Sequence, residues 1–204
     1  MKKLNRYTTL PVLLDMLSRK KLVLLDPSTW EDKNDSEIVA EYKKRKKLQA
    51  LFALCGSQGA ETIHHWKTFA DGISGCCVEF DLDKLVPLLK NVAGIRFGPV
   101  SYRRLRELKD EAIDVEQMPF TKRWPYRCEE EYRIIWESVE PALEFEIDFD
   151  LRTINRITIS QRMPDRVYAT IREALRGTFN NPDQKINRST IYQNKVWIGK
   201  FKNA

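Results

Sequence analysis

Apolar residues recur along this chain with two periods, one of two residues and one of three to four, and these periods predict interleaved strands and helices. Strands are expected where apolar and polar positions alternate, or where a short apolar run lies between turn residues: Leu4–Thr8, Leu22–Leu25, Leu48–Cys55, Ile73–Phe80, Ile95–Tyr102, Glu131–Trp136, Leu143–Ile147 and Ile154–Ile159. Helices are expected where apolar residues share one helical face: Leu10–Leu17, Ser36–Lys47, Glu61–Phe69, Asp81–Lys90, Arg103–Asp114 and Pro164–Arg176. Because the elements lack a strict strand–helix–strand rhythm, they indicate an α+β fold.

Local signals set several boundaries. Asp35 or Ser36 is expected to open the second helix, and Gly177 to end the last one. Met118–Arg127 is expected to be irregular or a short helix. A final strand near Val196–Ile198 is expected to return to the sheet through its tryptophan.

Length and composition indicate a protein that buries a core. The 204 residues, 42% of them hydrophobic, are expected to form a single domain, with a core over about residues 1–160 and a helix and strand extension over 161–204. No apolar run reaches the roughly 18 residues that cross a bilayer, and no signal-peptide core follows the charged N-terminus. We therefore expect a soluble cytoplasmic protein without a membrane partner.

The cysteines and histidines do not form a metal-binding pattern. Cys76 and Cys77 are adjacent and point to opposite faces of a predicted strand, and no Cys-x-x-Cys pair occurs. The two histidines, His64 and His65, are also adjacent. The sequence predicts reduced thiols and no bound metal.

The charge is basic, with a formal net charge of +6 and a pI of about 9.1. Part of the excess lies in the run Lys43–Lys47, which we interpret as a solvated helix end because cations suit a helix C-terminus. The overall balance permits a polyanionic partner or a phosphate-bearing cofactor.

The strongest candidate for chemistry is Cys128–Trp136, in which three glutamates precede an apolar strand. Alternate residues of a strand share a face, so Glu129, Glu131 and Arg133 are expected to point the same way. Two carboxylates this close repel unless cations compensate, a role assigned to Arg133 for Glu131 and to Arg127 for Glu129. A solvated edge strand carries such charges too, but the apolar residues after Arg133 favour a strand that enters the core. A carboxylate held there can stabilise an oxocarbenium ion.

Three further segments carry side chains with alternative roles. In His64–Asp71, Trp66 and Phe69 lie near one another as core anchors, or as an aromatic wall for a base or nicotinamide ring. Arg6 in the first strand suits a surface ion pair or a phosphate. The loop Trp30–Asp35 is expected to cap the next helix, with a substrate-side role as the alternative.

In this order, these segments resemble the bacterial family called domain of unknown function 2971. The resemblance rests on Leu4–Tyr7, Leu22–Pro27, Glu31–Asn34, Trp66–Ala70, Gly75–Asp81 and a late signature of Lys122, Trp124, Glu129, Glu131 and Arg133. It covers roughly the first three quarters of the chain. Glu31 stands where the family prefers Asn, and Phe69 where it prefers Tyr.

The chain also resembles the ADP-ribosyltransferase fold, through a first-strand Arg6, a strand-ending Ser57 and the late Glu129–Glu131. This resemblance implies a mixed, mostly antiparallel split sheet with flanking helices. Glu131, before an apolar strand, matches the residue that binds the nicotinamide ribose, and Glu129 matches the residue that orients the acceptor. Ser57 is the single hydroxyl of the serine motif, which is therefore incomplete.

The same resemblance implies an NAD-dependent ADP-ribosyltransferase, with NAD as a substrate and Glu131 and Glu129 as catalytic residues. The residues that it implies for NAD binding are Arg6, Tyr7, Ser57, Trp66 and Phe69. The acceptor is expected to be a nucleic acid or a protein, and the residues expected to bind it are Arg123, Arg127 and Arg133. The basic charge favours nucleic acid. Small bacterial transferases of this type are often toxins or antiphage effectors, which implies an antitoxin-type protein partner.

Two alternatives stay open at the level of the residues. A nucleic-acid-binding or nuclease-like defence protein would use the basic residues interleaved with Trp124, Tyr126 and Trp136, and it predicts salt-sensitive binding without NAD. A non-enzymatic interaction domain would carry the glutamates as a charged edge. It predicts that Glu131→Gln changes no NAD turnover.

Overall fold

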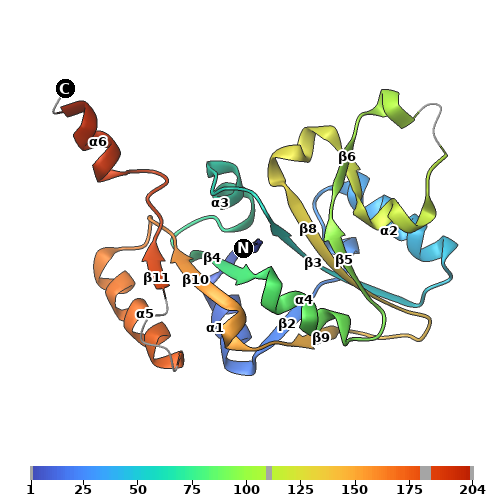
Figure 1. Cartoon of the computed structure of the whole chain (residues 1–204), viewed down its shortest axis with the longest axis horizontal. Helices are drawn as coiled ribbons and strands as arrows, with labels where there is room; N and C mark the ends of the chain where they lie inside the picture. Colours follow the sequence, from blue (N-terminus) through green and yellow to red (C-terminus); the bar gives the residue numbers. More distant parts are fainter. Residues whose placement is uncertain (1, 109–111, 180–184, 203–204) are drawn as a thin grey trace.

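A computed structural model describes residues 2–108, 112–179 and 185–202 (Figure 1). Within these residues the main sheet has seven strands in the order β11-β10-β4-β1-β3-β8-β5. Their bounds, in that order, are Lys185–Arg188, Ile154–Ile159, Gly75–Asp81, Lys3–Thr9, Ala50–Ser57, Glu131–Ser138 and Ile95–Pro99. Neighbouring strands are antiparallel except for the parallel pair β10 and β11. The mixed, mostly antiparallel α+β fold expected from the sequence is confirmed.

Two short ribbons accompany this sheet. β2 (Lys21–Leu24) pairs antiparallel with β9 (Phe145–Asp148), and β6 (Ser101–Arg103) pairs parallel with β7 (Thr121–Arg123). In the second ribbon, β7 carries the buried Lys122 and is followed directly by the segment that holds Glu129 and Glu131.

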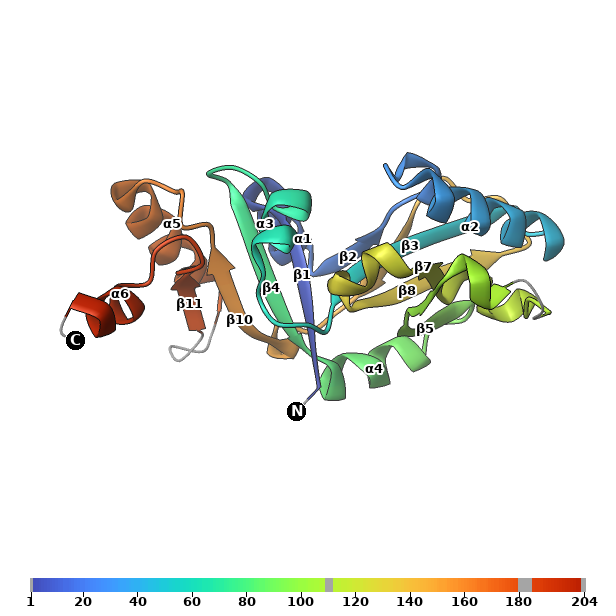
Figure 2. The same ribbon diagram turned by 90° about the horizontal axis from the view of Figure 1, so that it is seen from above.

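The main sheet opens between β1 and β3. β1 is paired with β4 along its whole length, but it meets β3 at one register pair, Asn5↔Ser57. Elsewhere on β3, the backbone N–H and C=O of Ala53 bond to Leu25 instead. Because those backbone groups are engaged, β3 diverges from β1 away from Ser57 (Figure 2). At the closed end Gly56 permits close contact, since a Cβ there would lie 2.6 Å from Leu4 Cδ1.

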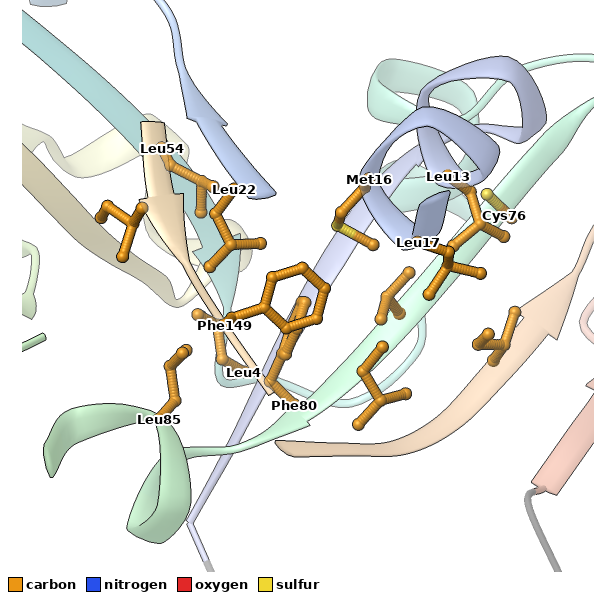
Figure 3. Packing of buried hydrophobic residues seen from close by; sticks show 14 of the residues in the cluster. Leu4, Leu13, Met16, Leu17, Leu22, Leu54, Cys76, Phe80, Leu85 and Phe149 are labelled. Atoms are coloured by element: carbon orange, nitrogen blue, oxygen red, sulfur yellow. The ribbon is translucent and has the colours of Figure 1, made fainter. Parts of the chain in front are cut away.

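One face of the sheet carries the main hydrophobic core (Figure 3). Helix α1 (Leu10–Arg19) contributes Leu13, Met16 and Leu17, and α4 (Leu82–Lys90) contributes further leucines. Phe80 of β4 meets Phe149 edge-on, with ring centroids 5.8 Å apart. This core fixes the position of β1 and β4, and hence one wall of the opening.

The opposite face is covered by α2 (Lys33–Arg45), α3 (Ile63–Phe69) and short 3₁₀ helices, of which η3 spans Val115–Phe120 and η4 spans Trp124–Glu129. The remaining 3₁₀ helices are η1 (Pro27–Thr29), η2 (Leu105–Leu108) and η5 (Leu151–Thr153). Helices α5 (Asp165–Thr178) and α6 (Lys195–Lys202) lie at the β11 end, far from α2 (Figures 1 and 2). Among the described residues, no helix has the length and apolar character needed to cross a membrane.

Several predicted boundaries need correction. Asp32, not Asp35 or Ser36, caps α2 by accepting a hydrogen bond from the backbone N–H of Asn34. Gly177 lies inside α5, which ends at Thr178. The predicted strand near Val196–Ile198 is part of α6.

Other corrections concern the middle of the chain. The expected strand Ile95–Tyr102 is divided into β5 and β6. In the described part of the expected helix Arg103–Asp114, Arg103 ends β6 and the one helical segment is η2. Residues 109–111 of that expected helix, and residues 180–184 and 203–204 of the expected C-terminal extension, lie outside the described residues.

Candidate active site

A cavity of about 660 Å³ lies in the opening between β1 and β3. β1 contributes Arg6 and Tyr7 to its walls, β3 contributes Ser57, and the glutamate cluster contributes Glu129 and Glu131. The cavity exists because β3 pairs with Leu25 instead of continuing along β1. It therefore brings together side chains from distant parts of the sequence.

Glu131 and Arg133 lie on the same face of β8, as alternation in a strand requires. Arg133 donates from Nε to Glu131 at 2.7 Å, and its two terminal nitrogens bond to both carboxylate oxygens of Asp35 at 3.0 and 2.7 Å. The guanidinium is fully buried and also lies over the ring of Trp30, 4.7 Å from its centroid. The predicted pairing of Arg133 with Glu131 is confirmed.

A second cation, Lys122 of β7, holds the two glutamates together. Its Nζ donates to Glu129 at 2.7 Å and to Glu131 at 3.3 Å, and it lies 3.7 Å from Asp35. Three carboxylates thus surround two cations, Lys122 and Arg133, in a region with little access to water. The prediction that Arg127 offsets Glu129 is wrong, because Lys122 takes that position.

The backbone conformation that brings Glu129 and Glu131 to the same lysine is not evident from the sequence. Glu129 ends η4, Glu131 begins β8, and Glu130 between them has a left-handed backbone with φ of 43°. Such a conformation is unfavourable for a residue other than glycine and persists where surrounding structure fixes it. The carboxylates at 129 and 131 therefore converge through a sharp reversal, not through an extended strand.

Their surroundings shift the pKa values of the two carboxyls in opposite directions. Burial alone would raise the pKa of Glu131, but Arg133 and Lys122 outweigh it and lower that pKa to about 2. Burial also raises the pKa of Glu129, and there Lys122 only partly opposes the shift. Neighbouring carboxyls with separated pKa values are typical of catalytic pairs.

Arg6 lines the same cavity from β1. Its Nε is buried and has no hydrogen-bond partner among the described residues, and no carboxylate of those residues forms an ion pair with it. Burial lowers its pKa. A half-buried cation without an anion is costly, so the site is suited to a negatively charged ligand.

Aromatic rings form another wall. Tyr7 stacks on His65 with ring centroids 4.9 Å apart, and Phe69 lies 6.4 Å from His65. His65 Nε2 donates to the backbone carbonyl of Glu129, so Nδ1 accepts from the hydroxyl of Thr62. Burial lowers the pKa of His65, which favours its neutral form.

Trp66 does not line the main cavity. It is buried behind Tyr7, edge-on at 5.6 Å, and donates from Nε1 to Glu61 at 2.7 Å. It borders a second, smaller cavity instead. Trp66 thus lies outside the main cavity, in which the sequence predicts it, and contacts Tyr7, which lines that cavity.

Ser57 is buried at the closed end of the opening and faces the cavity. Its hydroxyl accepts from the backbone N–H of Gly59 at 3.0 Å, while the Asn5 side chain donates to the Gly59 carbonyl at 3.0 Å. These bonds join the loop after β3 to β1. Ser57 is also the register partner of Glu131 on β8, which places the two side by side.

The three arginines expected to bind the acceptor lie in different surroundings. Arg123 and Arg127 are exposed on β7 and η4, outside the cavity. Arg127 and Arg104 both lie over the ring of Trp124, at 4.9 and 4.4 Å from its centroid. Arg133 has no exposed surface and bonds to Glu131, so its side chain does not reach the surface at which an acceptor was expected to bind.

Two residues of this site have no role that the sequence reveals. The position of Asp35 predicts only a helix cap, and Lys122 is only one member of a motif. A polar residue among apolar neighbours is a usable signal for Arg133, but its partner Asp35 is 98 positions away. Within the described ranges, no group of three or more His, Cys, Asp or Glu side chains is arranged to hold a metal ion.

No family model matches this chain, and neither does any curated protein sequence. Solved structures of the DarT protein of Thermus sp. 2.9 do match, each over 95% of this chain. The complex with NAD+ has 10% identity, a TM-score of 0.46 and 98% of its chain covered. The complex with ADP-ribosylated single-stranded DNA has 11% identity, a TM-score of 0.47 and 96% of its chain covered. The complex with carba-NAD+ has 9% identity, a TM-score of 0.45 and 98% of its chain covered.

Proposed function

We propose that this protein is an ADP-ribosyltransferase that uses NAD as a substrate and a nucleic acid as the acceptor. One observation carries the proposal: a single cavity is lined by an arginine without an anion, Arg6, and by an ionised carboxylate, Glu131. Its volume of about 660 Å³ falls within the range of roughly 300–1,000 Å³ usual for small-molecule sites.

Arg6 is the residue that we assign to the pyrophosphate. Its Nε–H has no acceptor among the described residues, and a guanidinium can donate two parallel bonds to phosphate oxygens. Binding of a dianionic ligand would supply the missing counter-charge. This assignment accounts for a cation that the rest of the described structure leaves unpaired.

The aromatic wall is assigned to the nicotinamide ring. Tyr7 is held between His65 and Trp66, so its orientation is fixed before a ligand arrives. Phe69 is exposed to 43% at the rim and is free to cover a bound ring. Aromatic faces suit the cationic nicotinamide through cation–π attraction.

Glu131 is assigned to the chemical step. When the bond between the ribose C1′ and the nicotinamide nitrogen breaks, its electron pair goes to the nicotinamide, which leaves as a neutral molecule, and positive charge develops on the ribose. The pKa of about 2 keeps Glu131 ionised and Arg133 keeps it oriented, so it stabilises that charge without reorganisation.

Glu129 is assigned to the acceptor. The acceptor nucleophile forms the new bond to C1′ and loses a proton, which a carboxylate of raised pKa accepts more readily than Glu131 does. Glu129 also lies toward His64, whose Nε2 is 3.9 Å away and which is 44% exposed. His64 thus offers a route by which the proton reaches solvent.

A nucleic acid is the preferred acceptor because of the surface next to Glu129. Arg104 and Arg127 both lie over the ring of Trp124, and the exposed Arg123 precedes it in the chain. Aromatic rings stack on unpaired bases and arginines bind phosphates. The proposal extends to a role as a toxin or antiphage effector with a neutralising protein partner, which follows from the resemblance to small bacterial transferases alone.

The proposal is tested by incubating the protein with NAD labelled on its adenylate and with single-stranded oligonucleotides. Label should move to the oligonucleotide, with release of nicotinamide, for the native protein and for the control Glu144→Gln, which changes an exposed glutamate that does not line the cavity. Glu131→Gln should lose at least about 10²-fold in rate. No transfer to oligonucleotide or to protein by the native chain would reject the proposal, and oligonucleotide binding without transfer would favour the nucleic-acid-binding alternative.

A further inference from the structure

A second cavity, of about 200 Å³, is lined by residues of β1, β4, β10 and β11. In the main sheet, β4, β10 and β11 lie on the side of β1 away from β8 (Figure 2). Asn5 and Tyr7 line both cavities, while Glu129 and Glu131 belong only to the first. We propose that this second cavity is a phosphate-binding site, held chiefly by Arg156 and Arg188.

The charged side chains that line this cavity are mostly cations. They are Lys3, Arg156 and Arg188, with one carboxylate, Glu61, and the carboxylates that pair with the two arginines do not line the cavity. Glu61 is already engaged, since it accepts hydrogen bonds from Trp66 Nε1 and from the hydroxyl of Ser189. Its negative charge is therefore partly offset by donors of the protein, which reduces its repulsion of an anionic ligand.

The two arginines present unused donors. The Nε atoms of Arg156 and Arg188 are both buried, and neither has a hydrogen-bond partner among the described residues. Their terminal nitrogens bind Glu79 and Asp165, which fixes the guanidinium planes. A buried donor without an acceptor is costly. An oxyanion in the cavity would accept from both and remove that cost.

The neutral lining and the size narrow the class of ligand. Hydroxyl groups of Thr158, Ser189 and Thr190 line the cavity along with the arginines, and such donors match the several oxygens of a phosphoryl group. The cavity is too small for a dinucleotide but holds a phosphate. The phosphate can come from a free phosphate ester or from a phosphodiester of a nucleic-acid strand.

The test measures binding without NAD, so its result does not depend on the proposed transferase activity. Inorganic phosphate is titrated into the full chain by calorimetry at low salt, using the native protein, the double variant Arg156→Gln/Arg188→Gln and the control Arg166→Gln, which changes an exposed arginine outside the cavity. We expect the double variant to bind at least about tenfold more weakly and the control within about twofold of the native protein.

Arg188→Lys separates loss of phosphate binding from a folding defect, because it keeps the charge that pairs with Asp165 and removes the Nε donor. It should weaken phosphate binding while leaving the melting temperature close to that of the native protein. Equal phosphate affinity of the native protein and the double variant, or no phosphate binding at millimolar concentrations, would overturn the proposal.

Two further titrations distinguish the sources of the phosphate. A nucleoside 5′-monophosphate and a single-stranded oligonucleotide are compared in the same three proteins. A loss confined to the monophosphate supports a free phosphate ester, and a loss for the oligonucleotide supports a backbone phosphodiester. A tenfold rise in the KM for NAD in the double variant would instead show that this cavity is part of the dinucleotide site. That result would overturn the proposal that it binds phosphate as a separate site.

Discussion

Glu129 and Glu131 accept hydrogen bonds from the same lysine amine, at 2.7 and 3.3 Å, yet the pKa values of their carboxyls shift in opposite directions. The difference comes from Arg133, which bonds to Glu131 and not to Glu129. One arginine therefore separates a firmly ionised carboxylate from one that accepts a proton more readily. The different roles that we propose for the two glutamates depend on that arginine and on its bidentate bond to Asp35.

Lys122→Met should damage both stability and activity. Removing one partner of a buried charge cluster leaves three carboxylates facing Arg133 alone, which typically costs about 3–5 kcal/mol. The same change should raise the pKa values of Glu129 and Glu131 and move the pH optimum of the transfer reaction upward. Urea unfolding and a pH–rate profile measure the two effects. Lys44→Met, at an exposed lysine of α2, is the matched control, and an unchanged profile in Lys122→Met would contradict the proposed coupling.

The stability of the native protein should fall in acid because of Glu131. Its pKa is depressed from the ordinary 4.5 to about 2, so its contribution is complete above pH 4.5 and is lost as pH falls toward 2. The shift corresponds to about 3 kcal/mol. The unfolding free energy of Glu131→Gln should therefore depend less on pH between 4.5 and 2. If the unfolding free energy of the variant and of the native protein changed equally with pH, this interpretation of the ion pair would be refuted.

Glu129→Gln should behave differently. The pKa of Glu129 is raised on folding, so its contribution is favourable below the unfolded pKa and is lost as pH rises through the folded value. The variant should therefore match or exceed the stability of the native protein at pH 7, while losing transfer to an acceptor. Thermal unfolding at pH 7 checks the first expectation and the labelled-NAD assay checks the second. If Glu129→Gln lowered the unfolding free energy at pH 7 more than Glu131→Gln does, the expectation for stability would be contradicted.

Much of the sheet is predictable from the sequence because its strands carry strong apolar patterns. The expected bounds of Ile154–Ile159 match β10 at both ends, and β8 begins at Glu131 as expected. The C-terminal error has a clear cause. Val196 and Trp197 have the apolar side chains typical of a strand, but they are exposed on α6, so apolar character there does not indicate burial.

The site is predictable only in part. Arg6, Ser57 and Glu131 are suitable residue types in a suitable order, and the structure brings all three to one cavity. The bond between Asp35 and Arg133 is not predictable, because no local pattern relates residues that far apart. The reversal at Glu130 is also hidden, since a left-handed backbone at a residue other than glycine has no clear sequence signal.

Arg6→Gln should weaken NAD binding more than it slows the chemical step. A residue that binds the pyrophosphate in both the ground state and the transition state raises KM when it is removed and leaves kcat nearly unchanged. The free protein should lose little stability, because the buried Nε of Arg6 has no partner among the described residues. Steady-state kinetics and thermal unfolding measure these effects. A fall in kcat at constant KM would assign Arg6 to the reaction itself.

Substitutions on the surface around Trp124 should weaken binding of the acceptor and leave the reaction with NAD unchanged. Arg123→Gln/Arg127→Gln removes two exposed cations, so the slope of log affinity against log salt for a single-stranded oligonucleotide should fall by about 0.7 for each phosphate that is no longer neutralised. Trp124→Ala should cost about 1–3 kcal/mol in oligonucleotide binding if a base stacks on its ring. NAD hydrolysis without an acceptor should be unchanged in both variants, since none of these positions lines the main cavity. Arg152→Gln, at an exposed arginine on η5, is the control. If the double variant and the native protein show the same salt dependence of oligonucleotide affinity, the acceptor binds to another surface.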